Sequence, residues 1–142
     1  MSQYRHILVG LDLSEDSESV LNKARGLAVA NQAKLSVAHV IEPLAFAYGG
    51  DAPVDLSDAQ NLMEEQARKR LDVLGDSVDV APNNRYVRLG QTASELHALA
   101  EEHAVDLLVV GSHGRHGWAI LFGNTANGVI KGAECDVLAV RV

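Results

Sequence analysis

The run Val105-Asp-Leu-Leu-Val-Val110 decides the fold, because it is the most uniformly apolar stretch of the chain and a glycine-rich stretch follows it directly. Its length and its Val and Leu content are typical of a strand buried on both faces, as in a parallel sheet. The chain then reads Gly111-Ser-His-Gly-Arg-His-Gly-Trp-Ala-Ile-Leu-Phe-Gly-Asn-Thr-Ala-Asn-Gly128, and a helix can start at Gly123-Asn-Thr125. These residues predict a strand, a glycine loop and a helix in succession.

The glycine loop is a candidate cradle for phosphate. Glycines let backbone N–H groups line a concavity with no Cβ in the way, and a helix start adds unpaired N–H groups and a partial positive charge. Arg115, His113 and His116 add basic character within an otherwise acidic chain. The alternative is that the glycines only make a tight connection between strand and helix.

Strand-like runs alternate with helical patterns along the rest of the chain. The expected strands are His6–Leu11, Lys34–Val40, Arg85–Leu89, Val105–Val110 and Asp136–Val142. Arg85–Leu89 alternates in polarity, which indicates a wetter strand near an edge. Alternation at this spacing predicts an α/β fold, a parallel sheet with right-handed crossovers and helices on both faces. Ligands of such sheets bind outside the carboxyl ends of the strands, where the strand order reverses.

Besides the helix predicted after the glycine loop, three helices are expected between these strands from their 3.6-residue periodicity. The first is expected to begin at Ser14, which lies in a turn whose residues can cap a helix. A second is capped by Ser57 and closed by Gly75. Its expected apolar face consists of Met63, Ala67, Leu71 and Leu74. The third opens in a capping box, Thr92-Ala-Ser-Glu95, and carries His103 on its buried stripe.

Composition places the chain among globular proteins and narrows its partners. The 142 residues, 47% of them hydrophobic, fit a single domain over 1–142. The formal net charge of −7 argues against broad binding to nucleic acid or to an anionic membrane. The sequence shows no signal-peptide segment and no run of membrane-spanning length. Its single cysteine, Cys135, permits no internal disulfide, so we expect a cytoplasmic setting.

Four motifs in a fixed order carry a family resemblance. They are His6-Ile-Leu-Val-Gly-Leu-Asp-Leu-Ser14, Ala38-His-Val40, Asp106-Leu-Leu-Val-Val-Gly-Ser-His-Gly114 and Cys135-Asp-Val-Leu-Ala-Val140. In this order and spacing the chain resembles the universal stress protein family over essentially its full length. The resemblance implies a Rossmann-like, doubly wound five-stranded sheet of order 3-2-1-4-5, with the loops after strands one and four side by side. It also implies a cytoplasmic stress-response role and a dimer.

The nucleotide-binding branch of that family carries Gly, two residues, Gly, nine residues, and then Gly followed by Ser or Thr. Gly111 and Gly114 match here, but eight residues precede Gly123, and Asn124 stands in place of the hydroxyl residue. In that branch the loop holds phosphates, the aspartate after the first strand meets the nucleoside, and the valine ending the second strand lies by the base. With Arg115 added from the loop, the predicted nucleotide site comprises Asp12, Val40, Gly111, Gly114, Arg115, Gly123 and Asn124.

Other kinds of site find less support in the sequence. The chain has no Gly-Lys-Ser/Thr of a P-loop, no dinucleotide fingerprint after the first strand and no nucleophile elbow. His113 and His116, joined by Asp12 or His39, make only a thin case for a metal site formed by protein ligands alone. Mg²⁺ held through nucleotide phosphates needs only one or two protein carboxylates. We expect His39 to be a hydrogen-bonded core histidine and Cys135 to be unreactive.

These observations predict a small dimeric binding module for ATP or a related adenine nucleotide, with Mg²⁺ when nucleotide is bound. Hydrolysis is expected to be slow or absent, because no general base or nucleophile stands beside the predicted phosphates. Two alternatives stay open: a nucleotide-free regulatory or interaction protein, and an esterase-like or phosphatase-like enzyme. Asp136–Val142 is an apolar strand with nothing after it to cover its edge, which predicts a homodimer through that strand.

Overall fold

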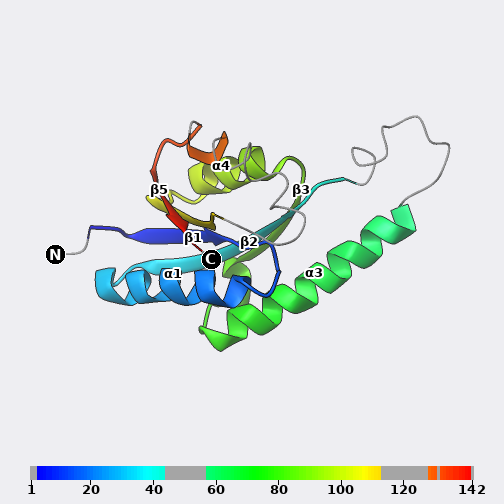
Figure 1. The fold of residues 1–142 in the computed structure, drawn as a ribbon, viewed down its shortest axis with the longest axis horizontal. Helices are drawn as coiled ribbons and strands as arrows, with labels where there is room; N and C mark the ends of the chain where they lie inside the picture. The colour runs from blue at the N-terminus through cyan, green and yellow to red at the C-terminus, as the bar shows by residue number, and fades with distance from the viewer. Residues whose placement is uncertain (1–2, 44–56, 113–127, 131, 142) are drawn as a thin grey trace.

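β1 (His6–Gly10) lies at the centre of a five-stranded sheet with the order β3-β2-β1-β4-β5 (Figure 1). The structure is a computed structural model that describes residues 3–43, 57–112, 128–130 and 132–141. All four strand pairs are parallel. The other strands are β2 (Lys34–Ile41), β3 (Arg85–Leu89), β4 (Leu107–Gly111) and β5 (Asp136–Val140). The predicted order 3-2-1-4-5 is therefore confirmed.

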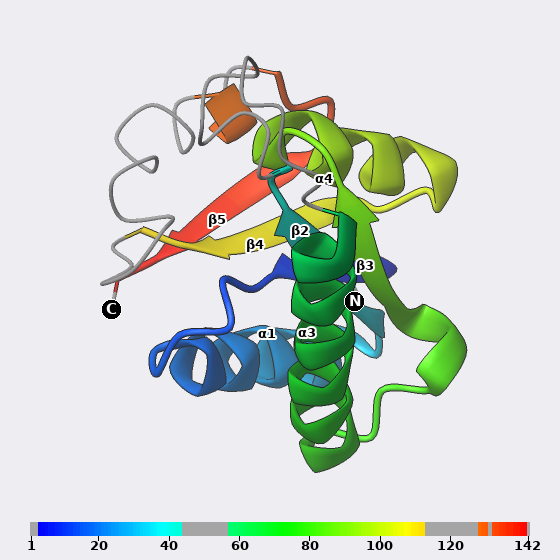
Figure 2. The same ribbon diagram turned by 90° about the vertical axis from the view of Figure 1, so that its right-hand side faces the viewer.

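Helices cover both faces of the sheet, as predicted. They are α1 (Ser17–Asn31), α3 (Ser57–Ser77) and α4 (Thr92–Glu102), with a 3₁₀ turn at Pro82–Asn84. Side chains alternate along β1, so Ile7 and Val9 pack with α1 and α3 while Leu8 packs with α4. Figures 1 and 2 show α4 on one side of the sheet with α1 and α3 on the other. Within the described residues, no helix is long and apolar enough to cross a membrane.

The two outer strands have a sheet partner on one side only within the described part of the chain. β3 pairs with β2, which confirms the predicted edge strand, and β5 pairs with β4. All five residues of β1 are buried, whereas every residue of β5 is at least partly exposed. The central strand of the sheet is therefore fully buried, and the outer strand β5 is exposed to solvent along its length.

α1 begins at Ser17, three residues later than the expected start at Ser14. The carboxylate of Asp12 accepts the backbone N–H of Ser14, which folds the chain into an Asx turn, and Leu13 takes a left-handed φ of 62°. Asp16 stands at the N-cap position, with no side-chain capping bond. The local side-chain bonds of Asp12 thus delay the helix.

α3 corrects two expectations about its ends. Gly75 does not close the helix, which continues to Ser77; Gly75 is buried against the side chain of Arg85. Met63 is 39% exposed and does not belong to the apolar face, whose buried members start at Ala67. The amino-terminal part of α3 extends beyond the sheet in Figure 1, so it has no sheet surface to cover.

α4 starts at Thr92, but the expected capping box does not form. Gln91 is the N-cap residue and makes no side-chain capping bond. The hydroxyl of Thr92 donates instead to the carboxylate of Glu42 at 3.3 Å. His103 lies just after the helix rather than on its buried stripe, and its ring stacks on Tyr86 with 4.8 Å between centroids.

β4 starts at Leu107 rather than Val105, because Asp106 has another role. Its two carboxylate oxygens accept the backbone N–H groups of Arg5 and His6 at 2.8 and 3.0 Å. This contact aligns the amino ends of β1 and β4, which pair from Ile7↔Leu107 onward. The strand is extended at its other end to Gly111.

Candidate functional site

The carboxyl ends of β1 and β4 lie next to each other, as the switch-point prediction requires. The two strands pair up to Gly10↔Val110, Asp12 follows β1, and Gly111 is the last residue of β4. From β1 the chain passes to β2 on one side of the sheet, and β4 lies on the other side. A parallel sheet leaves a crevice at such a reversal of strand order.

Asp12 is fixed at the mouth of this crevice. One oxygen of its carboxylate, Oδ1, accepts hydrogen bonds from the Ser14 backbone N–H at 3.0 Å, the Ser14 hydroxyl at 2.7 Å and the Ser17 hydroxyl at 3.1 Å. Ser17 is 1% exposed, so this network reaches into the first turn of α1. The carboxylate is therefore held in one orientation before any ligand arrives.

Val40 is 1% exposed as a whole residue, and its side chain packs in the core beneath α4. Its main chain is the part directed toward the β1 side of the sheet. Ala38 accepts from the backbone N–H of Leu11, on the β1 side, while Ile41 accepts from Gly90 on the β3 side. Successive residues of a strand present their N–H and C=O groups to opposite sides, so those of Val40 face the β1 side. The β1–β2 register ends at Gly10↔Ala38, so these groups lie beyond the paired part of β1.

His39 joins the carboxyl ends of β1 and β2. Its Nδ1 lies 2.7 Å from the carbonyl oxygen of Leu11, and because a carbonyl only accepts, Nδ1 carries the proton. Burial lowers the pKa of His39 below 6.5, and the Leu11 bond and Asp12 oppose that shift. The predicted hydrogen bond of this histidine is confirmed, although the residue is partly exposed rather than fully buried in the core.

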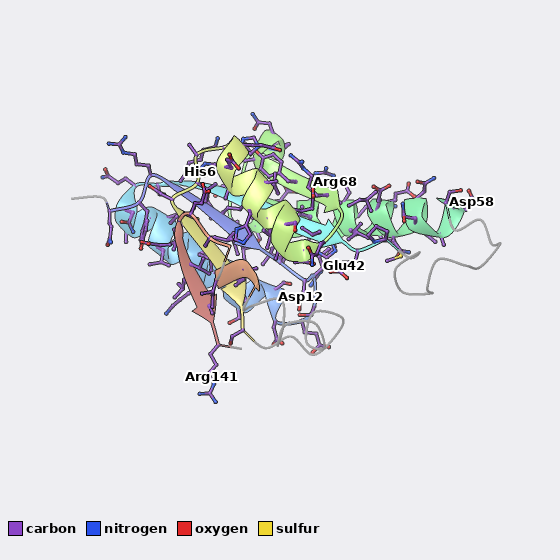
Figure 3. The ribbon with its side chains drawn as sticks, turned by 90° about the horizontal axis from the view of Figure 1, so that it is seen from above. His6, Asp12, Glu42, Asp58, Arg68 and Arg141 are labelled. Carbon is purple, nitrogen blue, oxygen red and sulfur yellow. The ribbon has the colours of Figure 1, made fainter. Side chains whose placement is uncertain are left out.

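Glu42 and Thr92 are residues of this end of the sheet that sequence reasoning missed. Glu42 follows β2, two residues after Val40, and Thr92 is the first residue of α4. In the view of Figure 3, Glu42 and Asp12 are both well away from His6, which begins β1. Thr92 is 1% exposed and holds Oε1 of the half-buried Glu42 at 3.3 Å. The spacing of two from Val40 was the available signal, because alternate strand residues share a face.

The comparisons with known proteins agree over the whole chain. Residues 3–141 match the model of the universal stress protein family. The chain belongs to this family. It is 40% identical over 138 residues to universal stress protein A homolog 1 of Coxiella burnetii, with 96% of each chain covered.

Solved structures of other proteins share the fold. A universal stress protein crystallised in complex with cAMP is 26% identical, with a TM-score of 0.63 and 98% of each chain covered. The hypothetical protein MJ0577 is 23% identical and superposes with a TM-score of 0.78, with 98% of this chain and 96% of that chain covered. The second likeness concerns the fold alone.

Of the predicted site residues of this universal stress protein, the structure brings together Asp12, Val40 and Gly111 at one end of the sheet. Gly114, Arg115, Gly123 and Asn124 lie outside the described residues, as do His113 and His116. Among the residues that are described, no group of three or more His, Cys, Asp or Glu side chains is placed to hold a metal ion.

Cys135 lies away from this crevice, in a hollow of about 360 Å³ between α4 and the start of β5. Burial and the charge of Asp136 raise the pKa of its thiol. A thiol with a raised pKa stays protonated near neutral pH, and the thiolate is the reactive form. This environment agrees with the expectation of an unreactive cysteine.

Proposed function

We propose that this universal stress protein is a stress-response module of the cytoplasm that binds an adenine nucleotide, ATP first among them, in the crevice beyond β1. The observation that carries the proposal is the orientation of Val40, whose backbone N–H and C=O face the β1 side of β2 beyond the last β1 pair. The single-domain architecture over 1–142 belongs to the same proposal.

The main chain of Val40 is complementary to adenine. A strand residue presents one donor and one acceptor side by side. Adenine carries the opposite pair on its pairing edge, the N1 acceptor beside the 6-amino donor. A 6-oxo purine has a donor at N1 and an acceptor at position 6. It would place its donor against the Val40 N–H and its acceptor against the Val40 carbonyl.

Asp12 supplies the sugar contact in this proposal. Its Oδ1 is engaged by Ser14 and Ser17, which orients the carboxylate without consuming its second oxygen in those bonds. Ribose hydroxyls are donors that a fixed carboxylate accepts at little entropic cost. The phosphates then extend toward Gly111 and the predicted loop residues Gly114, Arg115, Gly123 and Asn124, with Mg²⁺ bound through the phosphates.

We propose binding with little or no turnover. The related universal stress protein crystallised with cAMP supports an adenine nucleotide as ligand. A nucleotide-free interaction protein is the competing proposal, in which Gly111 and the glycines after it only form a turn.

Calorimetric titration of the charcoal-treated protein with ATP and Mg²⁺, and with cAMP, tests the proposal. We expect saturable heat, and we expect Gly114→Val and Gly123→Val each to weaken ATP binding at least about tenfold by blocking phosphate from the backbone. No heat at millimolar ATP would favour the nucleotide-free protein. Phosphate release in the presence of Mg²⁺ would measure any hydrolysis.

We further propose a homodimer through β5. β5 is the last strand of the sheet on its side and pairs only with β4 within the described residues. An uncovered strand edge favours pairing with a second copy, and a two-fold axis satisfies both edges at once.

A further inference from the structure

We propose that Glu42 is a specificity residue that selects a 6-amino purine over a 6-oxo purine; this rests on the nucleotide binding proposed above. The observation is a carboxylate held beside the segment of β2 that would read the base. Glu42 lies two residues beyond Val40, and Thr92 donates to its Oε1 at 3.3 Å.

The direction of β2 sets which part of the base lies toward Glu42. Along a strand the C=O of a residue lies nearer the following residues than its N–H does. The carbonyl of Val40 therefore lies on the Glu42 side of its amide. A base that accepts from the amide and donates to the carbonyl places its 6-substituent toward Glu42.

The exocyclic group of adenine has two hydrogens, and the Val40 carbonyl uses one of them. A carboxylate is an acceptor without a donor, so Glu42 can accept the second hydrogen. A 6-oxo group in that position would place a lone pair against the carboxylate. Sites with a committed polar partner discriminate strongly against an analogue that lacks the matching group.

Thr92 makes this carboxylate a fixed feature rather than a mobile surface side chain. Its hydroxyl is buried at the start of α4, at 1% exposure, while Glu42 itself is half-buried. The amino end of a helix also favours a negative charge nearby, which suits a carboxylate at this position. The arrangement leaves the second oxygen, Oε2, outside the Thr92 bond.

The test compares ATP with ITP, which differ only in the 6-substituent that the proposal concerns and in N1 protonation. Titration of the intact protein should show ATP bound at least about tenfold more tightly than ITP. Glu42→Gln keeps an acceptor for Thr92 and adds an amide donor. It should lower ATP affinity and raise ITP affinity, shrinking the ratio by about tenfold or more.

Two further variants separate the role of Glu42 from general effects. Glu101→Gln removes the same charge from an exposed position of α4 and should leave the ATP to ITP ratio unchanged. Thr92→Val should lower the ratio part of the way, and Thr92→Ser, which keeps the hydroxyl, should retain it.

The outcomes distinguish the two proposals. If ATP and ITP bind wild type and Glu42→Gln with the same ratio, the specificity role is overturned while nucleotide binding stands. If neither nucleotide binds wild type, the proposed function is overturned and the role of Glu42 with it. A ratio that shifts only in Glu42→Gln and the Thr92→Val variant supports the assignment.

Discussion

The imidazole of His39 donates its Nδ1–H to the carbonyl oxygen of Leu11 across 2.7 Å, so a side chain of β2 secures the end of β1. His6, the first residue of β1, makes comparable contacts at the other end of the strand. Its Nδ1 lies 2.9 Å from the His103 carbonyl oxygen, and its Nε2 lies 2.7 Å from the Ser36 hydroxyl. In both rings Nδ1 carries a proton, because a carbonyl oxygen only accepts, and burial lowers the pKa of both below 6.5.

These two histidines predict a loss of stability on mild acidification. In the unfolded chain each ring protonates near its ordinary pKa of 6.5, whereas in the folded chain protonation waits for a lower pH. The unfolded state therefore binds more protons as the pH falls below 6.5, and the free energy of unfolding decreases through that window. Well above pH 6.5 neither state binds these protons, and the contribution is fully present and flat.

Urea denaturation in steps between pH 7.5 and 5.5 measures this effect. His39→Gln keeps an amide donor for Leu11 and removes the titrating group, so its stability should vary less with pH than that of wild type. A pH profile identical to wild type in both His39→Gln and His6→Gln would assign the effect to other groups.

A second prediction concerns Gly75, whose neighbour leaves no room for a side chain. A Cβ there would lie 2.8 Å from Cζ and 2.9 Å from Cδ of Arg85. Arg85 cannot move aside cheaply, because its guanidinium donates to the Val80 carbonyl and to the carboxylates of Asp72 and Asp76. Gly75→Ala should therefore destabilise the protein by about 1–3 kcal/mol.

Gly26 provides the matched control on α1. It is an exposed helical glycine with nothing within 4 Å of an added Cβ. Gly26→Ala should stabilise the protein by about 0.5–1 kcal/mol, because alanine loses less backbone entropy in a helix. Thermal or urea unfolding of both variants checks the opposite signs. Equal effects at the two positions would contradict the packing role of Arg85.

The central architecture was predictable, while several element boundaries were not. The uninterrupted apolar runs at β1 and β4 identify buried parallel strands, because only strands covered on both faces lack polar alternation. Asp106 and Thr92 misled the boundary predictions, because each makes a hydrogen bond to a residue that only the fold brings near. Asp12 delayed the start of α1 through local bonds to Ser14 and Ser17. Gly75 looked like a helix end because the side chain that packs against it, that of Arg85, belongs to a later strand.

The candidate site was likewise predictable only in part. Asp12 and Val40 were predictable from motif and strand position, since residues after adjacent parallel strands meet at one edge. The contact of Glu42 with Thr92 joins residues 50 positions apart, and no local pattern announces it. Four of the seven predicted residues, Gly114, Arg115, Gly123 and Asn124, lie outside the described residues and stay predictions.

A third prediction separates the structural and ligand roles of Asp12. Asp12→Ala removes the acceptor of three hydrogen bonds and leaves the buried Ser17 hydroxyl without it, which should cost about 1–3 kcal/mol of stability. It should also weaken ATP by removing the sugar contact. Ser17→Ala loses a bond of the same network and keeps the carboxylate, so it should change stability but leave ATP affinity within about twofold. Equal losses of ATP affinity in both variants, measured by calorimetry, would show that Asp12 acts only by ordering the turn.

The last prediction concerns the outer edge of β5, where two neighbouring positions face opposite ways. Val140 accepts from the backbone N–H of Ser112 at 2.8 Å, so its own N–H and C=O face β4. The N–H and C=O of Ala139 therefore face the outer edge. Proline lacks an N–H, so its effect depends on which of these positions it occupies.

Ala139→Pro should disrupt a β5-to-β5 contact and shift the protein to monomer, while the sheet of each copy keeps its β4–β5 bonds. Val140→Pro should instead remove a bond within the sheet and lower the melting temperature. Sedimentation velocity at micromolar concentration reports the mass, and circular dichroism on heating reports the fold. A wild-type monomer, or an Ala139→Pro variant that stays dimeric with an unchanged melting temperature, would rule out this edge as the dimer contact.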